Sequence, residues 1–121
     1  MMSCNETVVQ QKAIRALVDK ARAVDKEDRR QDQRFPFFQP VTITAEHSRP
    51  VALSAFSRDI SESGIGLLLY WPLKPGSANL VIHFDQDEPI SVFGYVTWCR
   101  PCGQGWYVAG ISFNERYDVT A

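Results

Sequence analysis

Two short polar segments carry the residue types best suited to hold an anionic nucleotide. In the first, Arg30 and Arg34 are spaced as R-x-x-x-R, and in the second Asp59, Ser61 and Gly64 are spaced as D-x-S-x-x-G. An arginine fork donates hydrogen bonds in one plane, so it fits phosphate oxygens or the O6 and N7 edge of guanine. An ionised aspartate only accepts hydrogen bonds, so it suits the N1–H and N2–H₂ donors of the opposite guanine edge. Together the two segments predict a site for a guanine nucleotide.

Each segment taken alone also has an ordinary structural explanation. Arginines near the end of a helix commonly interact favourably with its C-terminal dipole. The D-x-S-x-x-G spacing is typical of a turn in which aspartate and serine bond to the local backbone. Glycine in such a turn permits positive φ or a close backbone approach. It is the occurrence of both segments in one chain, flanking two expected strands, that favours ligand binding.

The residues before the first segment predict a single N-terminal helix. Thr7 and Gln10 are spaced as a capping pair that opens a helix, and no glycine or proline interrupts residues 8–28. We expect this helix to end in the charged run of residues 26–30. Apolar residues repeat along it at helical spacing and form one stripe, namely Ile14, Leu17, Val18, Ala21 and Val24. Such a stripe packs against the rest of the domain or against a second copy of the chain.

From Phe35 onward the apolar residues follow the period of two that is typical of strands. The alternating or continuous apolar runs are Val41, Ile43 and Ala45; Val51, Leu53 and Ala55; residues 65–70; Leu80, Ile82 and Phe84; Ile90 and Val92; and residues 107–113. The prolines at positions 40, 50, 72, 75 and 89 fall at the edges of these runs or between them, where a missing N–H donor costs least. About six strands at this spacing predict a small antiparallel barrel or sandwich.

Length and composition exclude several classes of protein. The 121 residues fit one domain, and a net charge of −1 gives no global basic field for duplex DNA or a membrane surface. No apolar run approaches the ~20 residues of a membrane span, and the N-terminus lacks the apolar core of a signal peptide. Three cysteines are too few, and odd in number, for a disulfide framework. We therefore expect a cytoplasmic protein with no DNA partner and no membrane span.

The two polar segments, in this order and about 25 residues apart, resemble the signature of the PilZ domain family, which are bacterial receptors for cyclic di-GMP. Gly66 follows the second motif in Gly-Ile-Gly-Leu, as the family pattern does. Residues 94–98 and 108–113 look like the last two strands of that domain. The resemblance covers residues 28–115, so we divide the chain into an N-terminal helical extension, residues 1–27, and a PilZ domain, residues 28–121.

This resemblance implies a mainly β fold, a six-stranded antiparallel barrel that the N-terminal helix precedes. It also implies a binding protein without catalytic residues, whose ligand is cyclic di-GMP, and we expect no metal and no other cofactor. The ligand-binding residues that it implies are Arg29, Arg30, Arg34, Asp59, Ser61, Gly64, Gly66 and Trp98.

The roles of these residues also follow from the resemblance. Arg30 and Arg34 grip guanine and phosphate from a lead-in segment that wraps over the ligand, and a cation at Arg29 favours an intercalated ligand dimer over a monomer. Asp59 holds a guanine Watson–Crick edge, while the serine and first glycine of its motif shape the turn beneath the ligand. Trp98 falls where some relatives place an aromatic near the ligand, but packing in the barrel explains it equally well.

A C-x-x-C pair, Cys99 and Cys102, favours a rival function in redox or metal chemistry. A redox pair needs its first cysteine at a helix N-terminus, whereas here a glycine-rich stretch and a strand pattern follow. We therefore place both cysteines in a hairpin connection. A zinc site needs four ligands, and only Cys4, His47 and His83 remain as scattered candidates. The two histidines also lie near no nucleophile motif, so an enzyme is not expected.

These observations predict a cyclic di-GMP receptor that acts as a switch. The ligand would order residues 26–34, move the N-terminal helix relative to the barrel and expose a surface to a protein partner that the sequence does not identify. The apolar stripe of the helix could also form the interface of a homodimer. The alternative is a protein-interaction module on the same barrel that binds no nucleotide.

Overall fold

The computed structural model describes residues 4–24, 33–45 and 52–114. One helix precedes seven strands in these residues: α1 (Cys4–Val24), β1 (Phe35–Pro36), β2 (Pro40–Ala45), β3 (Ala52–Ile60), β4 (Gly64–Leu69), β5 (Gly76–Ile82), β6 (Ile90–Gly103) and β7 (Trp106–Ser112). The helix begins at Cys4, one turn earlier than the sequence predicts, so the expectation that Thr7 and Gln10 cap its start is wrong.

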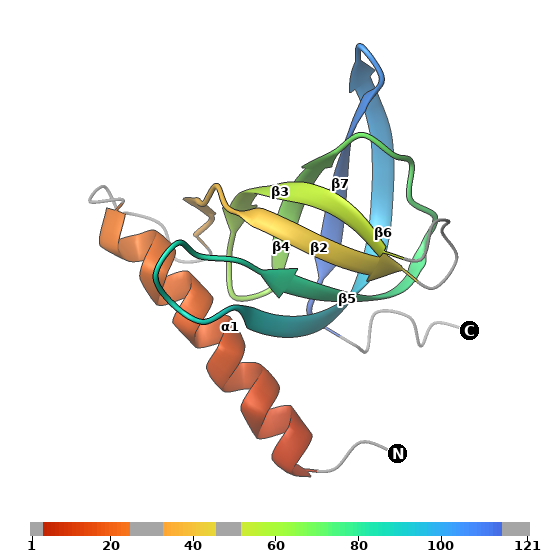
Figure 1. Ribbon diagram of the computed structural model, residues 1–121. Helices are drawn as coiled ribbons and strands as arrows, with labels where there is room; N and C mark the ends of the chain where they lie inside the picture. The colour runs from red at the N-terminus through yellow and green to blue at the C-terminus, as the bar shows by residue number, and fades with distance from the viewer. Residues whose placement is uncertain (1–3, 25–32, 46–51, 115–121) are drawn as a thin grey trace.

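The strands form a closed antiparallel barrel (Figure 1). Six strands follow one another around it in the order β3, β2, β5, β6, β7 and β4, and pairing of β4 with β3 closes the circle. The predicted six-stranded antiparallel barrel with an N-terminal helix is therefore confirmed. Closure leaves the barrel with no long unpaired sheet edge, which stabilises an isolated small β domain.

The two-residue strand β1 continues the line of β2 along β3. Phe35 pairs with Ile60 at one end of β3, and β2 pairs with the other end. Between them the chain bulges, and the buried hydroxyl of Ser57 fills the gap: it accepts a hydrogen bond from the Gln39 N–H (2.9 Å) and donates one to the Phe37 carbonyl (2.5 Å). These hydrogen bonds hold residues 37–39 against β3, where the chain passes from β1 into β2.

The barrel interior is filled by the alternating apolar residues that the sequence indicates. Every second residue of β2 is buried, and the same alternation holds for β3 and β5. The strand β4 is buried at five of its six positions, two of which are glycines. The residues with no exposed surface in this interior are Ile43, Ile60, Ile65, Leu67, Leu69, Leu80 and Ile82.

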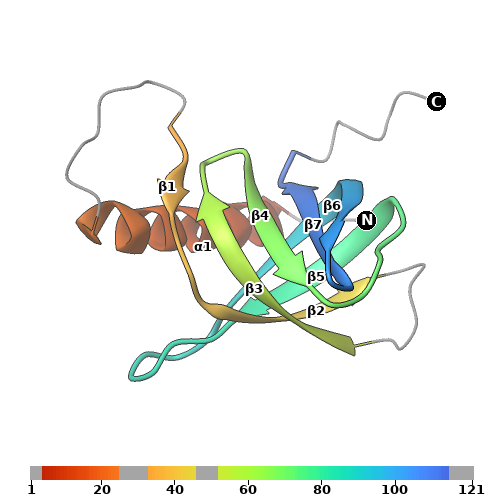
Figure 2. The ribbon, with the colours of Figure 1, turned by 90° about the horizontal axis from the view of Figure 1, so that it is seen from above.

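Helix α1 packs across one side of the barrel, against β6, β1 and β3 (Figure 2). Leu17, Val18 and Ala21, from the predicted apolar stripe, are buried there. These three residues are thus covered within a single chain, and Ile14 is partly buried against the same core. Among the described residues, no helix combines the length and the apolar character that a membrane span requires.

Gln10 fixes α1 to the edge of β6 at Phe93. Its side-chain Nε2 donates to the Phe93 carbonyl (2.6 Å), and the Phe93 N–H donates to its Oε1 (3.1 Å). In the described residues, β6 pairs with β7 only from Tyr95 onward, so the Gln10 amide takes the place of a neighbouring strand. This satisfies two backbone groups that would otherwise lack a partner in the fold.

Candidate functional site

A β-bulge in β3 turns Asp59 out of the barrel. Leu53 and Ser57 are buried on the inner face, and strict alternation would place Asp59 there too. The register with β4 shifts between Ser57 and Asp59, which makes Arg58 the additional residue. Because one extra residue reverses the faces that follow it, Asp59 points outward while Ile60 returns to the core.

A second register shift in β6 does the same for Trp98. Val96 is buried inside the barrel, and without the shift Trp98 would lie on the same face. Thr97 is the extra residue between them, and its hydroxyl donates a hydrogen bond to the carbonyl of Gly110 (3.2 Å). The indole of Trp98 is therefore on the outer surface, 39% exposed, and packing inside the barrel does not explain this tryptophan.

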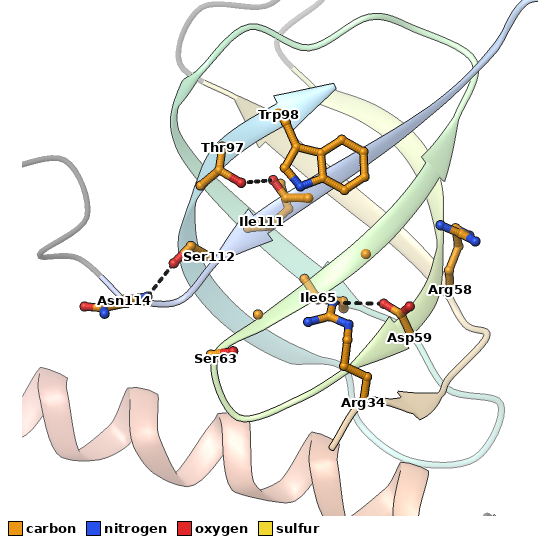
Figure 3. A pocket seen from close by; sticks show the side chains of 13 residues that line it. Arg34, Arg58, Asp59, Ser63, Ile65, Thr97, Trp98, Ile111, Ser112 and Asn114 are labelled. Carbon is orange, nitrogen blue, oxygen red and sulfur yellow. Dashed lines mark hydrogen bonds and ion pairs between the residues drawn. The ribbon is translucent and has the colours of Figure 1, made fainter. Parts of the chain in front are cut away.

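Asp59 and Trp98 are the two ends of one row of residues across four strands (Figure 3). The paired residues run Asp59 to Gly66, Gly66 to Gly110, and Gly110 to Trp98. A Cβ atom on Gly66 would lie 2.6 Å from Asp59 Oδ1, and one on Gly110 would overlap the Trp98 indole. The two glycines thus give the aspartate and the tryptophan room to lie over the sheet. We call these four residues the glycine row.

Arg34 lies just before the first strand and contacts the Asp59 end of the glycine row. It directly precedes β1, and the pairing of Phe35 with Ile60 brings it beside the D-x-S-x-x-G segment. Its Nη2 lies 3.0 Å from Asp59 Oδ1, and its Nη1 donates to Ser61 Oγ at 3.4 Å. The side chain is 45% exposed, so one face of the guanidinium remains open to solvent.

The D-x-S-x-x-G segment is a turn organised by Ser61. This serine is 1% exposed, and its hydroxyl oxygen accepts the Ser63 N–H at 3.2 Å, while its own N–H donates to the Gly64 carbonyl at 2.9 Å. Gly64 adopts no positive φ; it is required because a Cβ atom would overlap the carbonyl oxygen of Ile111. Of the two reasons expected for this glycine, close backbone approach is the one that applies.

These residues surround an open pocket of about 350 Å³ (Figure 3). That size is within the usual range for small-molecule sites. Its lining includes Arg34, Asp59, Gly64, Gly66 and Trp98 from the predicted site, with Ser61 just beneath through its bond to Arg34. Arg29 and Arg30 lie outside the described residues.

Eight further lining residues were not predicted, and three of them, Arg58, Thr97 and Gly110, belong to the glycine row or to the bulges beside it. An isolated glycine within a strand pattern often marks a close approach, and that signal was present at Gly110. Arg58 and Thr97 gave no comparable signal, because each is a bulge residue, and the extra residue of a bulge shows only in the pairing of two strands.

The cysteines do not form a redox motif of the thioredoxin type. Both belong to β6, and only residues 104–105 connect β6 to β7, so placing the two cysteines in the hairpin connection was wrong. Cys99 accepts a hydrogen bond from the Leu73 N–H at 3.4 Å, whereas Cys102 is exposed. Neither lies at a helix N-terminus, the position of the first cysteine in a redox motif of that type. No group of three potential metal ligands occurs within residues 4–24, 33–45 and 52–114.

Comparison with known proteins agrees with this geometry. The family model of the PilZ domain matches residues 28–121. No curated protein matches the chain significantly. The matched region contains the whole barrel and both polar segments, and it makes up most of the sequence. The chain belongs to the PilZ domain family.

Proposed function

We propose that this chain is a non-catalytic receptor for cyclic di-GMP, which it binds over the glycine row. PilZ domains are a known cyclic di-GMP-binding family and are generally receptor domains without catalysis. One observation carries the proposal: Arg34 of the first motif lies within hydrogen-bonding distance of Asp59 and Ser61 of the second, at the mouth of one pocket.

The glycine row suits a flat, polar ligand such as a guanine base. Because Gly66 and Gly110 have no side chains, the Asp59 carboxylate and the Trp98 indole lie close over the sheet. Both groups can then contact a flat ligand in the open pocket above them. Asp59 Oδ1 accepts from Arg34, and Oδ2 is then the acceptor for a guanine N–H donor. The exposed indole of Trp98 offers a ring on which a base can stack.

The cationic side of the ligand site rests on the arginines. Arg34 directs Nη1 to Ser61 and Nη2 to Asp59. Its remaining N–H donors, in the plane of the guanidinium, can form charge-assisted hydrogen bonds with a phosphate oxygen. Arg30 would add a second fork and Arg29 would set the number of ligand molecules. Arg58 lines the pocket from the opposite side of Asp59 and is a further cation within reach of the ligand (Figure 3).

Ligand binding would be transmitted to α1 through two contacts. The buried Phe35 follows Arg34 directly, and the Arg22 guanidinium of α1 lies 5.8 Å from its ring centre. Glu62, inside the D-x-S-x-x-G turn, is 3.3 Å from Arg15 of α1. A ligand that draws residues 26–34 over the pocket would therefore alter how the helix sits on the barrel and change the surface offered to a protein partner. Hydrogen exchange over residues 8–34 with and without the ligand tests this step, and equal protection in both states would refute it.

Titration calorimetry with cyclic di-GMP tests binding itself. We expect the wild-type chain to bind, and a dissociation constant weaker than about 100 μM would overturn the receptor proposal in favour of a nucleotide-independent interaction module. Asp59→Asn retains the size of the side chain but replaces one acceptor with a donor, so it should weaken binding roughly ten- to a hundredfold. Asp19→Asn, which changes an exposed carboxylate on α1, is the matched control and should leave the affinity unchanged.

A further inference from the structure

The end of the molecule farthest from α1 carries a cluster of exposed aromatic residues. The β6–β7 hairpin projects beyond the barrel on that side (Figure 1), and the connection between β4 and β5 lies against it. Tyr70, Trp71 and Trp106 are 61%, 43% and 36% exposed. We call residues 70–75 and 100–106 together the aromatic tip.

Two of the three exposed aromatic side chains of the tip, Tyr70 and Trp106, are held in place by contacts within it. The rings of Tyr70 and Trp106 pack with their centres 4.9 Å apart and tilted by 56°. The Tyr70 ring also lies over Gly105, where a Cβ atom would come within 2.8 Å of it. The turn itself contains three successive residues with positive φ, 106° at Gly103, 59° at Gln104 and 84° at Gly105. The aromatics are therefore presented on a structured turn, so that binding a partner orders little further chain.

The charges on the tip are all of one sign. Lys74 and Arg100 are its only ionisable side chains apart from a tyrosine and a cysteine, and no aspartate or glutamate occurs in residues 63–84 or 89–114. Arg100 lies over the Trp98 ring at 5.0 Å, and neither cation forms an ion pair with another described residue.

The opposite end of the molecule has a different arrangement of charge. There, lysine and arginine alternate with acidic residues and pair with them. Lys20 of α1 is 2.6 Å from Asp87 of the β5–β6 connection, and Arg15 is 3.3 Å from Glu62. The formal net charge of −1 for the whole chain therefore does not describe either end. At the α1 end cations pair with carboxylates, whereas the aromatic tip carries cations alone.

We propose that the aromatic tip docks on the surface of an anionic lipid bilayer. Tryptophan and tyrosine favour the membrane interface, where the ring is buried and its polar atom stays hydrated. Lysine and arginine beside them are attracted to anionic head groups. The tip is a projection (Figure 1), and a soft planar surface can accommodate such a shape. Charge complementarity also fixes the orientation, since the tip bears no carboxylate to be repelled.

Sedimentation with lipid vesicles tests the proposal. The wild-type chain, without nucleotide, should bind vesicles of phosphatidylcholine mixed with phosphatidylglycerol, bind pure phosphatidylcholine far more weakly, and be released by salt. Trp71→Ala and Trp106→Ala should each weaken binding to the anionic vesicles on the order of tenfold. Lys74→Ala should weaken it about fivefold, as expected for one cation near an anionic surface.

Two control variants distinguish the tip from exposed residues elsewhere. Phe38→Ala removes an aromatic that is 66% exposed outside the tip, and Lys12→Ala removes an exposed cation of α1; both should bind vesicles like the wild type. If Trp106→Ala loses its melting transition, Trp71→Ala and Lys74→Ala still decide the question. Failure of the wild-type chain to bind anionic vesicles, or an equal loss in Phe38→Ala, would overturn the proposal and leave the tip as a protein contact. Because no nucleotide is present, the outcome is independent of the cyclic di-GMP proposal.

Discussion

Two faces of the barrel share strands β3 and β6 but use them in opposite ways: the pocket over the glycine row and the seam on which α1 packs. At the pocket, side chains are absent from Gly66 and Gly110, and the polar groups there are held by few bonds. At the seam, Leu17 has no exposed surface, and Gln10 satisfies both backbone groups of Phe93. Packed side chains and hydrogen bonds fill the seam, whereas the pocket is open to solvent.

The difference indicates which residues maintain the fold and which await a ligand. Filling and hydrogen bonding stabilise the native state in the absence of any partner. Leaving space and exposed charge contributes little to stability, so the residues at the pocket are explained better by what they bind. Substitutions at the two faces should therefore separate stability from affinity.

The largest effect is expected at the seam, for Leu17→Ala. Removal of a fully buried leucine side chain typically costs about 2–5 kcal/mol, because a cavity remains behind. Urea denaturation should show this loss of unfolding free energy, while the folded fraction still binds cyclic di-GMP. Val9→Ala, at a position of α1 that is 64% exposed, should change stability by less than about 0.5 kcal/mol. A Leu17→Ala protein as stable as the wild type would mean that α1 is not part of the folded core.

The reverse pattern is expected at the pocket, for Arg34→Ala. Loss of charge-assisted bonds to the ligand should weaken cyclic di-GMP binding roughly ten- to a hundredfold in calorimetry. Stability should change by less than about 1 kcal/mol, because the ion pair with Asp59 is partly exposed, 45% at Arg34 and 32% at Asp59. If stability falls as much as in Leu17→Ala while affinity is retained, the pair is structural and the contrast between the faces fails.

The sequence predicts the seam and the barrel well because both depend on periodic patterns. Leu17, Val18 and Ala21 follow helical spacing, and the alternation in β2 and β5 places its apolar residues inside. The boundaries are less certain from sequence, since α1 begins at Cys4 before any capping residue that the pattern suggests.

The pocket is only half predictable, because its geometry depends on two bulges. The motifs identify Arg34, Asp59 and Ser61 by type and spacing, but alternation alone would bury both Asp59 and Trp98 inside the barrel. Their outward positions require the extra residues in β3 and β6, and a register shift is a property of two strands together. The positive charge of the aromatic tip is likewise not evident from the net charge of −1 for the whole chain.

Gln10→Ala should give a smaller loss of stability than Leu17→Ala. The substitution leaves the Phe93 N–H and carbonyl without the amide that now bonds them, and about 1–2 kcal/mol is expected for such partly buried groups. Denaturation measures the global loss, and hydrogen exchange at Phe93 should accelerate specifically. Gln11→Ala, its exposed neighbour on α1, provides the control. Unchanged exchange at Phe93 would show that Gln10 does not serve as the edge partner of β6.

The smallest effect is expected where the two faces meet, at the ion pair between Arg15 of α1 and Glu62 of the D-x-S-x-x-G turn. Both side chains are more than half exposed, 57% and 66%, so solvent screens their attraction. A double-mutant cycle with Arg15→Ala and Glu62→Ala should give a coupling of about 0–0.5 kcal/mol in the free protein, and neither variant should lose affinity for cyclic di-GMP more than about twofold.

The same cycle repeated with saturating ligand sharpens the comparison, because a switch acting through this contact must change the coupling when the pocket is filled. Equal coupling in both states would mean that this ion pair does not transmit ligand binding, and the signal would then have to pass through Phe35 and β1.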